Sequence, residues 1–351
     1  MGTPEASSFS GSGAAPMQSG GGGAGRPRIC VVGSINMDLV VRVSKLPTAG
    51  ATVLGSSYKT YSGGKGANQA VAAARLGADV VLIGSIGDDP HGRELLKTLQ
   101  AEKLDLSTLL VREGRTSGLA MITVAEGGEN TIVVAPGANA LLTADDVRAA
   151  SGVIESCDAL LMQLETPTQA VMVAAQIARE AGKPVLLNAA PARALSPELF
   201  KLIDVLIVNR VEAATLSGLD ANIEPARLAL RLADGGVPTI VLTLGAQGAM
   251  ITHRRRPKRI GAVHVKQTDS VGAGDAFAGA LAVSWPPVYA AAKAKSPEEF
   301  RLVDAALELA SAAGALATTK PGAIPALPTR AEVDALLNSA RPSEITLPGS
   351  R

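Results

Sequence analysis

Short apolar segments alternate with helical ones along most of this chain, and this alternation limits its possible folds more than any other feature. Apolar runs of strand length occur at Arg28–Ser34, Val80–Gly84, Ala159–Gln163, Pro184–Asn188, Val205–Asn209 and Thr239–Thr243. Segments with a helical pattern, such as Asn68–Leu76 and His91–Gln100, lie between them. Strands that alternate with helices form a mainly parallel sheet with helices on both faces. The sequence therefore predicts an α/β fold.

Four of the predicted strands end in a polar residue, and this indicates where a ligand would bind. These residues are Gln163, Asn188, Asn209 and Thr243. In open parallel sheets, ligands bind in a crevice beyond the carboxyl ends of the strands. The four side chains are therefore predicted to face one crevice.

Two segments depart from the alternation of strands and helices. Residues 36–61 and 116–135 contain alternating β-branched residues and glycine turns. We expect them to form a small separate sheet, which would act as a lid that excludes water from the crevice. The exposed face of such a sheet would also pair with a second subunit, so the expected assembly is a homodimer.

A glycine-rich turn with a carboxylate at its end precedes an apolar, alanine-rich helical segment. The turn is Gly272-Ala273-Gly274-Asp275. Free N–H groups at a helix N-terminus stabilise negative charge, so this turn can form an anion hole. Asp275 could take a proton from a hydroxyl held within hydrogen-bond distance. The alternative is an ordinary strand-to-helix turn with a capping aspartate.

A second glycine-rich segment, at residues 63–69, has the sequence GGKGANQ. It is not a phosphate-binding loop of the GxxxxGK[ST] type, because Lys65 is followed by Gly66. We expect its glycines to let the backbone approach a hydroxylated ligand closely. Asn68 has two donors and an acceptor for neighbouring hydroxyl groups, and Asn36 and Asp38 supply further acceptors unless they serve only as turn residues.

Composition restricts the partners of the protein. The chain has 351 residues, 47% of them hydrophobic, which is enough for a large core. Its 33 basic and 32 acidic residues give a net charge of +1, so neither nucleic acid nor an anionic membrane is the expected partner. Cys30 and Cys157 form no CxxC pair, and no histidine has the spacing of a zinc ligand. We expect the two cysteines to be buried free thiols.

The two ends of the chain differ from the rest in composition. Residues 1–27 are rich in glycine and serine and lack apolar periodicity, so we expect a disordered tail without the apolar segment of a secretory signal. A second, C-terminal tail is expected at residues 341–351, which leaves one folded domain at 28–340. Every apolar run that approaches membrane-spanning length is interrupted by a charged residue or a glycine. The expected location is the cytoplasm.

Six sequence motifs occur in a fixed order along the chain. They are GSINMD at 33–38, GGKGANQA at 63–70, LMQLETP at 161–167, NRVE at 209–212, LTLGAQG at 242–248 and SVGAGDAF at 270–277. In order and approximate spacing they resemble those of the ribokinase family of PfkB-type carbohydrate and nucleoside kinases, and the resemblance covers about residues 28 to 340. The resemblance implies a three-layer αβα sandwich with a mainly parallel central sheet and a small β-sheet lid.

The resemblance also implies an activity and its catalytic groups. The implied reaction is ATP-dependent phosphorylation of D-ribose at its 5-hydroxyl, which gives D-ribose 5-phosphate and ADP. Asp275 would be the catalytic base, and the N–H groups of Gly272, Ala273 and Gly274 would form the anion hole. The implied sugar-binding positions are Asn36, Met37, Asp38, Gly64, Lys65, Gly66, Ala67, Asn68 and Glu165.

The nucleotide and metal positions follow from the same resemblance. The implied nucleotide-binding positions are Asn209, Glu212, Thr243, Leu244, Gly245, Ala246, Gln247, Gly248, Gly274 and Ser311. Asn209 and Glu212 match an N-x-x-E element that organises Mg²⁺ and phosphate, largely through water. A site for a monovalent cation, usually K⁺, would be drawn from Asp269, Val271, Ala317, Lys320, Gly322 and Ala326.

The chain departs from the family pattern at several places. Asp269-Ser270-Val271 replaces the commoner Asp-Thr-Thr, which keeps the acidic ligand and removes one hydroxyl. Residues 285–300 are expected to lengthen the connection between the helix that carries Asp275 and the next helix. The basic run at 254–259 is expected to be a solvated hairpin loop.

The choice of substrate depends on few residues. Aromatic residues make up 2% of the chain, which favours a small sugar over a nucleoside, because a nucleobase usually stacks on an aromatic ring. Fructose, deoxyribose and adenosine stay open as other acceptors, and so does a sugar sensor without turnover, although the intact Asp275 argues against it. A dinucleotide-dependent oxidoreductase is not expected, because no GxGxxG motif follows the first strand.

Overall fold

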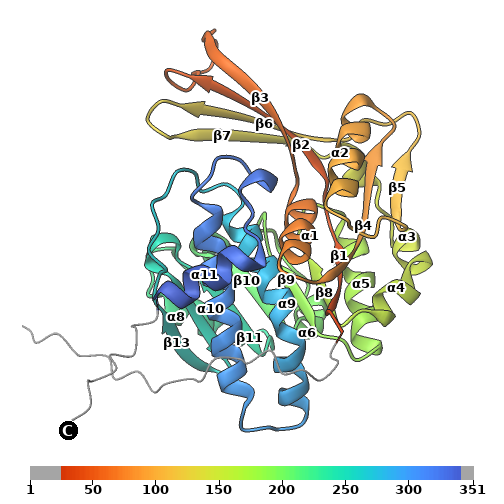
Figure 1. Cartoon of the computed structure of the whole chain (residues 1–351), viewed down its shortest axis with the longest axis vertical. Helices are drawn as coiled ribbons and strands as arrows, with labels where there is room; N and C mark the ends of the chain where they lie inside the picture. Colours follow the sequence, from red (N-terminus) through yellow and green to blue (C-terminus); the bar gives the residue numbers. More distant parts are fainter. Residues whose placement is uncertain (1–24, 341–351) are drawn as a thin grey trace, which may run out of the picture.

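The computed structural model describes residues 25–340. Within this range the central sheet has nine strands in the order β13-β12-β11-β10-β9-β8-β1-β4-β5 (Figure 1). Their bounds are β1 Arg28–Val32, β4 Asp79–Gly87, β5 Leu109–Arg112, β8 Ala159–Met162, β9 Val185–Asn188, β10 Val205–Asn209, β11 Thr239–Thr243, β12 Ala249–His253 and β13 Arg256–Ile260. Neighbours from β11 to β5 pair in parallel, and only the pairs β11–β12 and β12–β13 are antiparallel, so that β12 alone runs against the other strands of this sheet. The expected mainly parallel sheet is confirmed.

Successive residues of the strands point into two separate cores. On β1, Ile29 and Val31 belong to one core, whereas Cys30 and Val32 belong to the other. All four are fully buried, which is why the strand is a continuous apolar run. The free cysteines Cys30 and Cys157 are both buried, as expected.

Helices cover both faces of the sheet and complete the three layers. The first core includes side chains from α1 Lys65–Arg75, α2 Pro90–Ala101, α9 Ala273–Lys293, α10 Glu299–Ala317 and α11 Arg330–Ala340. The second core includes α3 Ala144–Ala149, α4 Ser151–Ser156, α5 Thr168–Glu180, α6 Pro197–Leu202, α7 Arg210–Ser217 and α8 Pro225–Ala233. Three short 3₁₀ helices are η1 Gly137–Leu141, η2 Gly245–Gln247 and η3 Ile324–Ala326.

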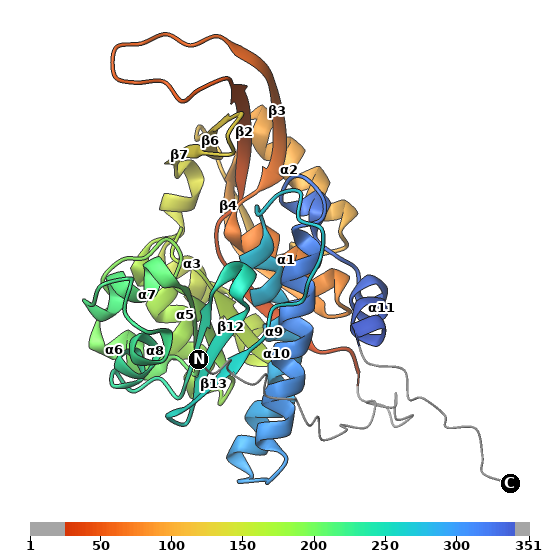
Figure 2. The same cartoon turned by 90° about the vertical axis from the view of Figure 1, so that its left-hand side faces the viewer.

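A second sheet stands apart from the central one, as expected from residues 36–61 and 116–135. It has four strands within the described range, in the order β3-β2-β6-β7. Their bounds are β2 Asn36–Val43, β3 Gly55–Gly63, β6 Gly118–Ala125 and β7 Asn130–Ala135. Figures 1 and 2 show this sheet projecting beyond the end of the central sheet where the parallel strands finish.

The strand order reverses between β1 and β8. From β1 the chain order runs outward through β4 to β5 on one side and through β8, β9, β10 and β11 on the other. Such a reversal separates the connections that leave the two central strands and opens a crevice beyond their carboxyl ends. Ser34 follows β1 and Gln163 follows β8, so both lie at this point.

The expectation for residues 285–300 is wrong. Trp285 and the two prolines after it lie inside α9, which continues to Lys293, so the connection to α10 spans only residues 294–298. Each proline removes a helix hydrogen bond. Trp285 and Val288 are buried, and their packing holds the segment in the helix despite those losses.

The basic run forms a hairpin, as expected, but it is only partly solvated. Arg254 and Arg255 make the turn between β12 and β13, both with positive φ. The Nε of Arg254 donates to the buried Glu299 at 2.8 Å. The tail expected at residues 1–27 lies mostly, and that at 341–351 wholly, outside the described residues. Among residues 25–340, no helix has both the length and the apolar character to cross a membrane.

Candidate active site

Asp275 lies in the first turn of α9, above the middle of the central sheet. The helix begins after Gly272, whose φ of 79° is a conformation that favours glycine. The N–H of Ala273 makes a long hydrogen bond of 3.4 Å to the Ser270 carbonyl, while those of Gly272 and Gly274 have no protein acceptor within the described residues. This helix of 21 residues therefore presents two unpaired N–H groups and its positive dipole end beside a carboxylate.

Two amide side chains from α1 hold the Asp275 carboxylate. Asn68 donates through Nδ2 to Oδ2 at 2.9 Å, and Gln69 donates through Nε2 to Oδ1 at 2.9 Å. Asp275 and Asn68 are both buried. The Oδ1 of Asn68 is also buried and has no partner within the described chain, so it can accept a hydrogen bond from a ligand hydroxyl. The expected pairing of Asn68 with a hydroxylated ligand thus has an open acceptor beside the base.

Glycines bring α1 against the connection between β1 and β2. A Cβ on Gly66 would lie 2.5 Å from the backbone of Gly33 and Ser34, and one on Gly64 would lie 2.6 Å from the Asn36 nitrogen. The absence of a Cβ at Gly64 and Gly66 thus places Asn36 and the start of α1 side by side. The expected approach of this backbone to a ligand stays a prediction.

Asn36 and Glu165 are each fixed by neighbours from elsewhere in the fold. The Asn36 Oδ1 accepts from Asn139 Nδ2 at 2.7 Å, and the same asparagine bonds to both the N–H and the carbonyl of Ile35. Glu165 Oε2 accepts from Ser34 Oγ at 2.5 Å and from the Lys65 N–H at 3.2 Å. Glu165 therefore caps the start of α1 with one oxygen and leaves the other for a ligand.

Negative charge accumulates in this corner of the molecule. Burial, together with the nearby Glu165 and Asp275 carboxylates, raises the pKa of Asp38 to about 7, although Lys65 opposes the shift. Burial acts to lower the pKa of Lys65, but the surrounding carboxylates outweigh it and the net shift is upward. The site thus holds a firmly charged lysine among acidic groups, one of which titrates near neutral pH.

Asn209 and Glu212 form the N-terminal cap of α7. The Asn209 Oδ1 accepts from the Glu212 N–H, and Glu212 Oε2 accepts from the Asn209 N–H, both at 2.8 Å. Burial raises the pKa of Glu212, while the Asn209 hydrogen bond and Lys65 act against the shift. The cap occupies one oxygen of Glu212, and the other stays available for a hydrated metal ion.

A cavity of about 280 Å³ lies beside the first turn of α9. It contains five of the expected nucleotide positions besides Gly274: Thr243, Gly245, Ala246, Gly248 and Ser311. The Oγ of Ser311 is buried without a partner within the described chain, which suits contact with a polar ligand edge. Asn209, Glu212, Leu244 and Gln247 do not line it. His264, Gln267 and Thr318 do line it, and the sequence carried no motif that could reveal them.

The residues expected to hold a monovalent cation lie on two loops that Asp269 joins. Its carboxylate accepts from the N–H of Val271 at 3.1 Å and from that of Gly322 at 3.0 Å. Within the described residues, the carbonyl oxygens of Lys320 and Gly322 accept no hydrogen bond from protein groups. Free carbonyls beside a carboxylate are the oxygen donors that hard cations prefer, so these residues fit K⁺.

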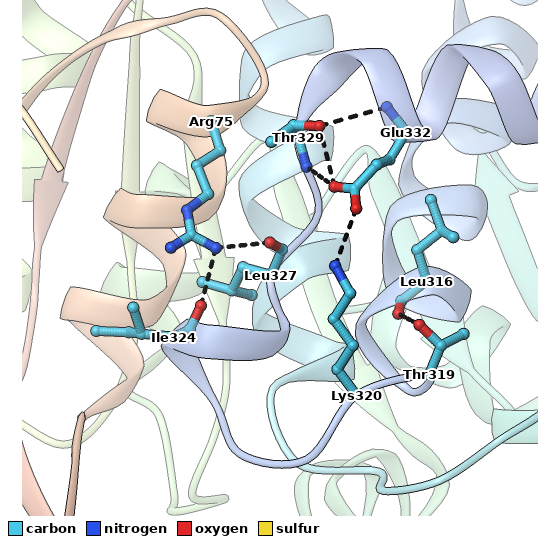
Figure 3. Close-up of polar contacts among 8 residues, drawn as sticks. All are labelled: Arg75, Leu316, Thr319, Lys320, Ile324, Leu327, Thr329 and Glu332. Carbon is cyan, nitrogen blue, oxygen red and sulfur yellow. Dashed lines mark hydrogen bonds and ion pairs between the residues drawn. The ribbon is translucent and has the colours of Figure 1, made fainter.

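The second of these loops is held in place by side chains on both of its flanks (Figure 3). Arg75, at the end of α1, donates to the carbonyls of Ile324 at 2.9 Å and Leu327 at 2.7 Å. Glu332 accepts from the Thr329 N–H at 2.7 Å and from Lys320 Nζ at 2.9 Å. These contacts lower the pKa of Glu332 to about 2. The loop is therefore tied to α1 and to the start of α11.

Not all predicted side chains face the crevice. Met37 and Ala67 are buried in the first core, so only their backbone could reach a sugar. Conversely, Gln69 and Asn139 contribute hydrogen bonds to the site that the sequence analysis did not predict, whereas Gln163, which was predicted to face the crevice, donates to Gln69. A buried amide has no characteristic spacing, although the polar end of β8 was a signal for Gln163.

A carboxylate at a helix N-terminus, an adjoining cavity and an open hydroxyl-binding acceptor are the parts of a phosphotransferase that acts on an alcohol group. The chain belongs to the pfkB family of carbohydrate kinases, whose model matches residues 26–330.

Known relatives span nearly the whole chain. It is 39% identical over 317 residues to a ribokinase of Haemophilus influenzae, covering 90% of this chain and all of that protein. The structure of a Giardia lamblia ribokinase superposes with a TM-score of 0.80 at 27% identity, covering 90% of this chain and 99% of that one. An Arabidopsis thaliana ribokinase complexed with ribose and ATP gives a TM-score of 0.76 at 28% identity, covering 89% and 98%.

Proposed function

We propose that this protein transfers the γ-phosphoryl group of ATP to the 5-hydroxyl of D-ribose, with Asp275 as the catalytic base. The observation that carries the proposal is the open Asn68 Oδ1 beside the Asp275 carboxylate, at the N-terminus of α9. The relatives that act on ribose, and the one complexed with ribose and ATP, support the choice of sugar.

The residues at the crevice have different roles in the proposed reaction. Asn36, Asp38 and Asn68 orient the sugar through its hydroxyls, and Glu165 adds its free oxygen. Asp275 accepts the proton of the attacking hydroxyl as the bond to phosphorus forms. The Gly272 and Gly274 N–H groups stabilise the charge that develops on the transferred group. Because such transition states are loose, alignment and charge neutralisation contribute most of the rate.

Two cations complete the proposed site. Mg²⁺ bound with ATP would neutralise part of the phosphate charge. Glu212 would hold it through water with its uncapped oxygen, and no cluster of three or more acidic, histidine or cysteine ligands occurs within residues 25–340 to bind it directly. K⁺ would be held by Asp269 and the carbonyls of Val271, Ala317, Lys320, Gly322 and Ala326, where it would order the loop before Gly272.

The lid is the proposed surface for a homodimer. Exposed large apolar side chains lie on both faces of the lid: Tyr58, Met121 and Val133 share one face, Ile132 and Val134 lie on the other, and Leu54 precedes β3. A hollow of about 530 Å³ on the same sheet is lined by Leu39, Val41 and Tyr58. Apolar patches of this kind mark protein interfaces. We propose that two lids pair in the cytoplasm, each covering the other's apolar face.

The experiment that tests this function is ADP release from MgATP with D-ribose, D-fructose, 2-deoxyribose or adenosine, each with and without K⁺. Ribose-dependent release that rises with K⁺ is expected. Release with another acceptor only would keep the mechanism and reject ribose. No release with any acceptor would reject the kinase function and favour a sugar sensor.

A further inference from the structure

Gln69 lies behind the catalytic carboxylate, and all its polar side-chain atoms are occupied. Its Nε2 donates to Asp275 Oδ1 at 2.9 Å and to Asn188 Oδ1 at 3.0 Å. Its Oε1 accepts from Gln163 Nε2 at 2.6 Å. The side chain is fully buried, so no water competes for these atoms.

Its neighbours fix which way the Gln69 amide faces. Asn188 donates through Nδ2 to the Ile207 carbonyl at 3.2 Å, which turns its own oxygen toward Gln69. Gln163 donates into the Gln69 oxygen from the other side. A half-turn of the Gln69 amide would place its oxygen against two acceptors, the Asn188 and Asp275 oxygens, so only one orientation is stable.

The fold makes room for this row of amides at the switch point of the sheet. Gln163 follows β8, and a Cβ on Gly33, which follows β1, would overlap its Oε1. Gln69 comes from α1, which packs on β1 and β4, and Asn188 ends β9. Four separate segments of the chain thus meet around Gln69, and Gln69 bonds to the Oδ1 of Asp275.

The electrostatic surroundings explain why such support is needed. Asp38 on β2, Glu165 after β8 and Glu212 on α7 place negative charge around Asp275, and Lys65 is the opposing cation. A carboxylate must be ionised to act as a base. Amide N–H donors favour the ionised form and fix the direction of its free lone pairs.

We infer that Gln69 is a positioning residue for the proposed reaction: its amide, oriented by Gln163 and Asn188, keeps the Asp275 carboxylate ionised and aimed at the acceptor hydroxyl. The inference rests on the proposed function of Asp275. Gln69 itself touches neither the sugar nor the nucleotide in this account, so its loss affects turnover more than binding.

The test is the variant Gln69→Met, which keeps an unbranched side chain and removes both hydrogen-bonding groups. We expect kcat with D-ribose to fall about 10- to 100-fold, with KM for ribose within about threefold. The acidic limb of the pH profile of kcat/KM should move upward, because the carboxylate loses an N–H donor that favours its ionised form. Gln176→Met, the same change at an exposed glutamine of α5, is the control and should leave both unchanged.

A purely structural role would alter thermal stability without moving the acidic limb. A folded Gln69→Met protein with kcat within threefold of the parent and an unmoved limb would overturn the inference. If that variant does not fold, Gln163→Met decides, because Gln163 does not contact Asp275. It should move the limb in the same direction with a loss of about 3- to 10-fold in kcat, and an unmoved limb would overturn the inference as well.

A second readout separates this inference from the proposed function. In protein labelled with ¹³C-aspartate, the carboxyl signal of Asp275, assigned by its loss in Asp275→Asn, can be titrated without any substrate. Its midpoint should rise in Gln69→Met and stay in place in Gln176→Met. If the parent protein does not phosphorylate ribose but the midpoint still rises, the substrate proposal fails and the support of Asp275 by Gln69 stands. An unchanged midpoint refutes that support.

Discussion

Asp38 illustrates how a residue proposed to bind the sugar can lower the stability of the sugar-free protein. Its carboxylate is 9% exposed and lies beside other acids, and its pKa of about 7 is far above the usual value of 3.8. Burial of a charge costs free energy that a bound sugar can recover through hydrogen bonds. The cost depends on pH, because only the ionised form suffers it.

We therefore expect Asp38→Asn to stabilise the sugar-free protein at pH 8 and to have little effect at pH 4. With a folded pKa above the unfolded one, the native state binds more protons, so stability is fully present below pH 3.8 and is lost as the pH rises through 7. The gain at pH 8 is at most on the order of 4 kcal/mol. Denaturant unfolding at both pH values measures it, and an equal effect at the two would contradict the assignment.

At the scale of elements, the close approach of α1 to the β1–β2 connection positions the residues that we propose to bind the sugar. We predict that Gly66→Ala destabilises the protein by about 1–3 kcal/mol, because its Cβ would meet backbone that cannot rotate away. The KM for ribose should also rise in Gly66→Ala. Gly152→Ala in α4, where nothing lies within 4 Å, is the matched control in chemical unfolding. A change at Gly66 no larger than at Gly152 would refute the packing argument.

The end of the same helix holds the loop that would bind K⁺. Arg75 bonds to two carbonyls of residues 324–327 and pairs with Glu102 at 2.5 Å. We predict that Arg75→Met raises the K⁺ concentration needed for half-maximal activation several-fold, because the loop loses its anchor. Arg301→Met, which removes only an exposed pair with Glu298, is the control. The measurement is turnover as a function of K⁺ concentration in the two variants. Equal activation curves for Arg75→Met and Arg301→Met would contradict the proposal that Arg75 anchors the loop.

For the whole molecule, the lid patch predicts the state of assembly. Val133→Asp places a charge on the face of β7 that continues the hollow and should convert a dimer to a monomer in sedimentation experiments. Val111→Asp on β5, similarly exposed but outside the lid sheet, should leave the dimer intact. A monomeric parent protein, or a Val133→Asp protein that stays dimeric, would reject the lid as the interface.

Local patterns in the sequence predicted the parallel sheet and the separate small sheet, because each strand carries its own apolar signature. The prolines after Trp285 gave the wrong boundary, since the burial that keeps them helical is a tertiary effect. The close packing of Gly64 and Gly66 against Asn36 and Gly33 was not predicted from the sequence. The fold decides which backbone segments come into contact, and no local sequence pattern indicates such contacts.

Within the candidate site, the sequence indicated residues that belong to motifs and missed those that support them. Asp275 and Asn68 stand in glycine-rich segments whose chemistry is recognisable. Asn139 and Gln69 act through pairing with residues 103 and 206 positions away, and no spacing rule reveals such partners. The sequence analysis also did not predict that Asn209 and Glu212 form a capping box, although the spacing of such a box can be recognised from sequence.

The most direct test of the central claim compares turnover and binding in Asp275→Asn. This change keeps the size of the side chain and removes the base. We predict that kcat with D-ribose falls by about 100- to 10,000-fold, the contribution of a general base, while the ribose Kd from calorimetry changes by only a few-fold. A kcat within tenfold of the parent value, in a protein that still binds ribose, would contradict the assignment of Asp275 as the group that activates the hydroxyl.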